Sequence, residues 1–247
     1  MNHACSCCGY RTLPEAGAYL TCPVCLWQDE PIPEVAARSG LNDGMTLLEA
    51  QRHFAQHGVI EPSLAQRARK PLPFETRDTS WQSEQQRADL AAQPVLEDIE
   101  RAYAGTPSPT TFTNADHCEE CHEHNEWFLN HAPGDLDLEL LESISSGWNP
   151  FCFLEAPGWA WYLPTVTRLG LQPGGGWWLE DLVGLHLAPL PDDADQVPWN
   201  LRGHTVGQLR ALSALVDLAV EQAEVRQMDR GQLEAVQRLW AQESWYV

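Results

Sequence analysis

The stretches Cys5–Tyr10, CSCCGY, and Cys22–Cys25, CPVC, decide the fold of the N-terminal part of the chain. Each holds a pair of cysteines separated by two residues, and thirteen residues, Gly9–Thr21, lie between the pairs. Two thiolates with this spacing can share one ion, and four thiolates satisfy the tetrahedral preference of zinc. The sequence therefore predicts a structural zinc site with the ligands Cys5, Cys8, Cys22 and Cys25.

Two neighbouring residues favour tight loops around such an ion. Gly9 follows the first pair, where a positive φ is often required, and Pro23 fixes φ inside the second pair. Cys7 is a fifth thiol, which we expect to be a small buried residue or a spectator at the rim. Two disulfides are the alternative pairing, but they are typical of secreted proteins, and nothing in the sequence indicates secretion.

The residues around both pairs resemble the bacterial cysteine-rich CPCC family. The resemblance is carried by Cys5–Leu13, Cys22–Asp29 and Leu47–Gln51, and it covers roughly residues 3–75. Ser6 stands where the family name has Pro, which stiffens the first loop less but removes no ligand. The family has no established activity, so the resemblance implies a small zinc-binding domain and no reaction.

The negative charge of the chain is concentrated after residue 75. Residues 76–247 hold nine Lys and Arg against 27 Asp and Glu, a net charge of −18, whereas residues 1–75 have a net charge of −2. Nucleic-acid binding depends on basic patches, and the only basic cluster is Arg67–Lys70, which contains the single lysine of the chain. The composition predicts no nucleic-acid partner and favours a basic protein partner.

The sequence also predicts where the protein resides. Residues 1–5 enter the first cysteine pair at once, without the apolar segment of a signal peptide. No uncharged apolar run approaches the roughly twenty residues of a membrane-spanning helix. We therefore expect a cytoplasmic protein that neither crosses nor binds a membrane.

The pattern of residues predicts an α+β protein in two parts. A zinc-ribbon-like domain, residues 1–75, is followed by a helical and Pro-rich linker, residues 76–109, and by a larger helix-rich, acidic and Trp-rich domain, residues 110–247. Short strands are expected between the cysteine pairs. Thr46 and Glu49 form a capping box, which predicts a helix over residues 47–57 with Gly58 as its C′ residue.

The larger domain is expected to mix helices with two strands. The strands are predicted at residues 151–154 and 159–163, joined by a turn at Glu155–Gly158, with Cys152 in the core. Helices are predicted at 81–104 with an interruption at Pro94, and at 136–144, 164–169, 177–182, 205–225 and 231–240, with a loop at 188–199. Residues 117–164 resemble uncharacterised bacterial proteins loosely, which implies no activity.

A second group of metal-binding residue types occupies His117–His124, HCEECHEH. Cys118 and Cys121, with two ligands from among His117, His122, His124 and His131, have the composition of a second metal site. Reduced, partly buried thiols and a redox pair are the alternatives that stay open. Haem attachment requires export, and a zinc deaminase needs two separate motifs that one turn cannot provide, so both are disfavoured.

The sequence contains no P-loop, dinucleotide-binding, Gly-x-Ser-x-Gly or His-Glu-x2-His pattern. It therefore indicates no catalytic residue and favours, without deciding it, the absence of enzymatic activity. We interpret the chain as a zinc-binding protein-interaction protein, in its concrete version a bacterial immunity or antitoxin-like protein that binds a basic protein. The alternative is a metal-dependent or thiol-redox enzyme that uses Cys118, Cys121 and the neighbouring histidines.

Overall fold

The computed structural model describes residues 2–31, 37–144, 149–188 and 201–241. The chain divides into two compact units, Met1–Ala88 and Asp89–Val247. The boundary falls inside helix α2, Glu84–Tyr103. The predicted division into residues 1–75, 76–109 and 110–247 stays a prediction.

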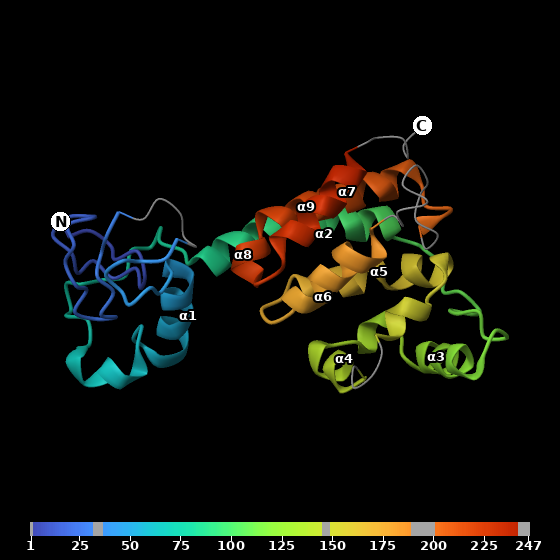
Figure 1. Cartoon of the computed structure of the whole chain (residues 1–247), viewed down its shortest axis with the longest axis horizontal. Helices are drawn as coiled ribbons and strands as arrows, with labels where there is room; N and C mark the ends of the chain where they lie inside the picture. Colours follow the sequence, from blue (N-terminus) through green and yellow to red (C-terminus); the bar gives the residue numbers. More distant parts are fainter. Residues whose placement is uncertain (1, 32–36, 145–148, 189–200, 242–247) are drawn as a thin grey trace. The chain divides into compact units, whose positions relative to one another are not determined.

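The described part of the first unit consists mostly of loops around the cysteines (Figure 1). It also contains helix α1, Leu47–His57, the 3₁₀ helix η1, Pro62–Arg67, and the start of α2. The predicted capping box is present: the backbone N–H of Glu49 donates to Thr46 Oγ1, and the Glu49 carboxylate accepts from the Thr46 N–H. Gly58 ends α1 with φ +75°. The prediction for this helix is confirmed at both ends.

The described part of the second unit consists of helices and the loops that connect them. Its elements after α2 are α3 (Glu119–Asn130), η2 (Pro133–Asp135), α4 (Leu138–Ile144), η3 (Pro150–Phe153), α5 (Ala156–Gly170), α6 (Gly176–Asp181), the π-helical turn η4 (Leu182–His186), α7 (Val206–Glu221), α8 (Ala223–Arg226) and α9 (Arg230–Trp240). Helices α7 and α9 lie side by side, as do α5 and α6 (Figure 1). No described helix is long and apolar enough to cross a membrane.

The α+β class is not confirmed, because the described residues are mostly helical and their only β pairing is four isolated bridges. Two of these bridges, His3 with Leu13 and Thr21 with Gln28, stand where a ribbon of short strands was expected. The reason is local: the cysteine loops use their backbone groups to close turns around the thiols, which leaves few groups for a ladder.

The two predicted strands at residues 151–154 and 159–163 are wrong, because they form η3 and the first half of α5. Pro157 lies in the first turn of α5, where its missing N–H costs nothing. The buried residues Trp159, Tyr162, Leu163 and Val166 follow the helical spacing of three, four and seven. The predicted turn at Glu155–Gly158 is therefore the start of this helix.

Three further predictions concern the interruption at Pro94, the position of Cys152 and the loop at 188–199. Helix α2 continues through Pro94, which is exposed, because Ala92, Ile99 and Tyr103 on either side of it bury a continuous face in the core. Cys152 is exposed and not a core residue, since η3 turns its side chain outward while Phe151 is buried. The predicted loop at 188–199 lies almost wholly outside the described residues.

The core of the second unit is rich in aromatic side chains. Phe112, Phe128, Phe151, Trp159 and Tyr162 are each at most 3 % exposed, and their ring centroids lie 5.1 to 6.1 Å apart in six contacting pairs. The Tyr162 hydroxyl on α5 donates to the carbonyls of Phe128 and His131 at the end of α3. These contacts fix α3, which carries the second group of cysteines, against α5.

Candidate metal centre

The four predicted zinc ligands lie together in the first unit. Their sulfur atoms are all within 4.8 Å of one another, and all four residues are 0 % exposed. The Sγ atoms of Cys5 and Cys25 are 3.6 Å apart, and those of Cys8 and Cys22 are 3.7 Å apart. These distances are far longer than a disulfide bond of about 2.05 Å, so the pairing by disulfides is not formed.

The sulfur positions fit a tetrahedral metal ion. With zinc–sulfur bonds of about 2.3 Å, the sulfurs of a regular tetrahedron stand about 3.8 Å apart, close to the two distances above. Cys7 is also 0 % exposed, but it does not belong to this group. The structure therefore gathers the set that the spacing predicted and leaves the fifth thiol outside it.

The two cysteine loops share one backbone design. In the first, the N–H of Gly9 donates to the Cys5 carbonyl over 2.8 Å, and the N–H of Cys5 donates to the Tyr10 carbonyl over 2.9 Å. In the second, the N–H of Leu26 donates to the Cys22 carbonyl over 2.9 Å. The N–H of Cys22 then donates to the carbonyl of Trp27 over 2.8 Å. The thiols therefore converge from two equivalent turns.

Both turns require a left-handed residue directly after their second cysteine. Gly9, with φ +77°, has this position in the first loop, and Leu26, with φ +72°, has it in the second. An L-residue with a branched side chain adopts this conformation at a cost of about 1 kcal/mol or more. The sequence indicated a left-handed residue at Gly9, whereas nothing in it indicated this conformation for Leu26.

The pKa directions of these thiols show that the four sulfurs resist ionising together. The hydrogen bond to Cys22 raises the pKa of Cys5 and of Cys8, and burial raises the pKa of Cys25. The hydrogen bonds to Cys25 and the other thiols lower the pKa of Cys22, to which Thr12 Oγ1 also bonds at 3.1 Å. Four buried sulfurs cannot ionise together in a dry site unless a cation compensates their charge.

Residues beyond the predicted domain hold the first loop in place. The Trp81 indole N–H donates to the Ser6 carbonyl over 3.2 Å, and the Arg77 Nε donates to the Cys8 carbonyl over 3.0 Å. The Arg77 guanidinium stacks 4.5 Å from the Trp81 ring centroid. A Cβ atom at Gly9 would lie 2.6 Å from that ring, so the glycine also makes room for Trp81. Sequence reasoning missed both contacts because they join residues far apart in the chain.

These loops carry the cysteine pattern of a known family. Residues 3–75 match the model of the cysteine-rich CPCC family. This CPCC segment contains all five cysteines of the first unit and ends before Arg77 and Trp81. No curated protein and no solved structure matches the chain. The family match and the buried group of four cysteines together indicate metal binding by the CPCC segment.

The second predicted group assembles only in part. The ligand atoms of His117, Cys118 and Cys121 lie within 4.8 Å of one another in the second unit. His122 and His124 do not join them, and the His124 ring stacks on Phe153 with a centroid distance of 4.1 Å. His131 instead bonds through Nδ1 to the Trp127 carbonyl at 2.8 Å. Three exposed or half-exposed ligands make an incomplete metal site by comparison with the first.

Cys118 and Cys121 differ in their surroundings. Cys118 is the exposed N-cap residue of α3, and its Sγ accepts the backbone N–H of Cys121 at 3.4 Å. This hydrogen bond lowers the pKa of Cys118. The side-chain hydrogen bond to Cys118 raises the pKa of the half-exposed Cys121. The two sulfurs are 3.3 Å apart, and His117 Nδ1 lies 3.8 Å from Cys121 Sγ.

Asn125 fixes the middle of α3. Its side chain is 5 % exposed, and its Oδ1 accepts the backbone N–H groups of Phe112 and Thr113 at 2.8 and 3.4 Å. We expect Asn125→Ala to lower the free energy of unfolding of the second unit by about 2 kcal/mol, because it leaves these buried donors without an acceptor. Urea denaturation measures the change. Asn130→Ala, at an exposed position of the same helix, is the control and should cost less than about 0.5 kcal/mol. Equal effects of the two substitutions would contradict this role.

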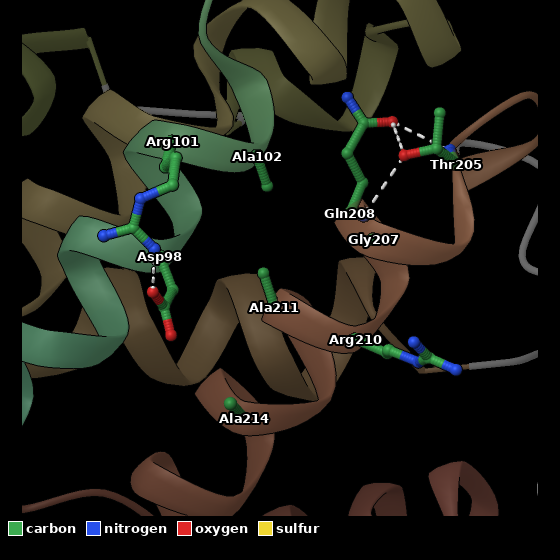
Figure 2. A pocket seen from close by; sticks show the side chains of 9 residues that line it. All are labelled: Asp98, Arg101, Ala102, Thr205, Gly207, Gln208, Arg210, Ala211 and Ala214. Carbon is green, nitrogen blue, oxygen red and sulfur yellow. Dashed lines mark hydrogen bonds and ion pairs between the residues drawn. The ribbon is translucent and has the colours of Figure 1, made fainter.

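A pocket of about 340 Å³ lies elsewhere in the second unit, between α2 and the start of α7 (Figure 2). Ala102, Ala211 and Ala214 line it with small side chains. Its charged groups are already engaged on one side, where Arg101 pairs with Asp98 (Figure 2). Neither group of cysteines and histidines contributes to its lining, so the pocket is separate from both candidate metal sites.

Proposed function

We propose that the CPCC segment binds one zinc ion through Cys5, Cys8, Cys22 and Cys25, and that this ion is structural. The observation that carries the proposal is the group of four buried thiols at the spacing of a tetrahedron. A site closed by four thiolates leaves no coordination position for water or a substrate. Its expected contribution is therefore to the folding of the first unit and not to a reaction.

The metal content of the purified full chain tests this proposal. We expect one zinc ion per chain by elemental mass spectrometry, released when a strong chelator unfolds the first unit. A tetrahedral set of four thiolates also suits iron, and that outcome would overturn the identity of the metal while leaving the site intact. A metal-free chain with a folded first unit would overturn the site itself.

We also propose that the protein binds a basic protein through its acidic second unit. Residues 102–167 contain ten Asp and Glu and no Lys or Arg. Nine of these acidic residues lie between Asp116 and Glu142, and all nine are exposed. Such a surface attracts a partner of opposite charge and raises the rate of association. The concrete version is a bacterial immunity or antitoxin-like protein that masks a basic toxin.

Affinity purification with the tagged full chain tests this second proposal. We expect a partner with a high isoelectric point, released by about 0.5 M salt because exposed charges are then screened. Replacing Glu123, Glu126 and Glu139 by Gln should slow association about tenfold. Replacing Glu97 and Glu100 of α2, beside Arg101, by Gln is the control. This change should slow association less than the triple variant does. If no basic protein is recovered, or if the triple variant binds it unchanged, the proposal fails.

A further inference from the structure

Cys118 and Cys121 have the arrangement of a dithiol that can open and close a disulfide. They lie three residues apart at the first turn of α3, with their sulfurs 3.3 Å apart. Closing the S–S bond requires a shift of little more than 1 Å, since a disulfide is about 2.05 Å long. Cys118 is exposed, so a reagent in solution can reach it.

The surroundings give the two thiols different tasks. Cys118 Sγ accepts a backbone N–H at the N-terminus of α3, which stabilises negative charge on that sulfur. Cys121 is half-exposed, and its sulfur lies beside the ring nitrogen of His117. An exposed sulfur that is stabilised as a thiolate suits attack, whereas a less exposed sulfur beside a ring nitrogen that can take its proton suits the second step.

We propose that Cys118 and Cys121 are a redox-active pair that reduces disulfides of neutral or positively charged molecules by thiol–disulfide exchange. This proposal concerns the second unit and does not depend on zinc in the first. A metal site at the same residues is the competing use of the group. It is less favoured because His122 and His124 supply no fourth ligand.

The exchange balances in two steps. The Cys118 thiolate attacks one sulfur of the substrate R–S–S–R, the substrate S–S bond breaks, and R–S⁻ leaves. Cys121 then gives its proton to His117 and attacks Cys118 Sγ, which breaks the mixed disulfide and releases the second R–S⁻. The pair loses two electrons and becomes a disulfide. The substrate gains two electrons and leaves as two thiolates, which take up one proton from His117 and one from water.

The charge around the pair selects among disulfides. Glu119 and Glu120 lie between the two cysteines, Asp116 and Glu123 flank them, and all four carboxylates are exposed. No Lys or Arg occurs between Arg101 and Arg168. An anionic disulfide is repelled by this field, and a cationic one is attracted. The preferred substrate is therefore a cationic disulfide, such as one in a basic peptide or protein.

Three small disulfides of similar size test the chemistry and the selectivity on the reduced full chain: cystamine, a dication; hydroxyethyl disulfide, which is neutral; and oxidised glutathione, an anion. Reactions are quenched with acid and mapped by peptide mass spectrometry. We expect Cys118 to react fastest with cystamine and slowest with oxidised glutathione. The two rates should differ about tenfold at low salt. The double variant Glu119→Gln, Glu120→Gln should reduce that difference.

Variants separate the two steps. Wild type should end as the 118–121 disulfide without a lasting adduct, Cys121→Ser should retain a mixed disulfide on Cys118, and His117→Gln should lengthen the life of that adduct. Cys152 is the control, since its side chain is open to reagents while partial desolvation of its thiol and the nearby Asp181 raise its pKa. It should react at least about tenfold more slowly than Cys118, because an ordinary thiol is only a few per cent ionised near pH 7.

Two results would overturn the proposal. The first is a wild-type chain in which Cys118 reacts no faster than Cys152 or accumulates the mixed disulfide. The second is a zinc content of two per chain that falls to one in the double variant Cys118→Ser, Cys121→Ser, which would make the group a metal site. One zinc in both proteins, with rapid closure of the 118–121 disulfide, is the expected result.

Discussion

Substituting Cys22 by Ser is expected to unfold the first unit and to lower its metal content from one ion per chain to none. The described apolar core of this unit is small, and five of its eleven buried members are cysteines. Structural zinc contributes roughly 10 kcal/mol or more of apparent binding free energy, comparable with the whole stability of a small domain. Elemental mass spectrometry and the dispersion of amide NMR signals measure the two effects.

Cys7→Ser is the matched control for that experiment. Cys7 and Cys22 are both 0 % exposed and receive the same chemical change, but only Cys22 belongs to the group of four sulfurs. The control should keep its metal and its fold at a modest cost in stability. A folded first unit in Cys22→Ser, or metal loss in both variants, would contradict the ligand set.

The second large effect is expected from Gly175→Ala, which should lower the free energy of unfolding of the second unit by about 3 kcal/mol. A Cβ atom at this position would lie 2.0 Å from the Leu169 carbonyl oxygen at the end of α5. Gly170 has the complementary role, since its Cβ would lie 3.0 Å from the Leu179 backbone on α6. The obstructing atoms belong to backbone, so the helices must separate to admit a methyl group. Urea denaturation followed by tryptophan fluorescence measures the loss.

Gly207→Ala gives the opposite sign and serves as the control. Gly207 lies in the first turn of α7, and a Cβ atom there would meet nothing closer than 3.9 Å. Alanine should raise the free energy of unfolding by about 0.5–1 kcal/mol, because it restricts the unfolded chain and favours the helix. Two variants with equal stability would show that the close approach of α5 and α6 is not rigid.

The sequence predicts best where the structure is decided by neighbours in the chain. The cysteine spacing identified the four thiols that gather in the first unit, and Thr46 with Glu49 identified the start of α1. Both signals act within a few residues and depend on backbone groups that must be satisfied locally. The hydrogen bonds that close the cysteine loops are of the same local kind.

The wrong prediction of a strand at residues 159–163 arose because these residues fit both the two-residue period of a strand and the 3.6-residue period of a helix. Trp159, Trp161 and Leu163 alternate as in a strand, while Trp159, Tyr162 and Val166 follow a helix, and only burial separates the two patterns. Pro164 lies inside α5 and made a continuous helix look unfavourable. Leu154, Tyr162 and the other core partners decide the outcome through tertiary packing, which overrides local preference.

The second group of cysteines shows a different limit. Composition listed four histidines as candidate ligands beside Cys118 and Cys121, but it did not distinguish among them. The helix that begins after Cys118 carries His122 and His124 away from the thiols and leaves His117 beside Cys121. Which residues converge depended on where α3 begins.

The distribution of amines in the chain has a practical consequence. Lys70 is the only lysine, it is exposed, and it lies in the first unit, whereas the second unit offers carboxylates and the accessible thiol of Cys118. An amine-directed dye therefore has a single side-chain target in the first unit, and a thiol-directed dye has an exposed target in the second. With Cys121 and Cys152 replaced, the side chains of Lys70 and Cys118 offer one position for a fluorophore in each unit.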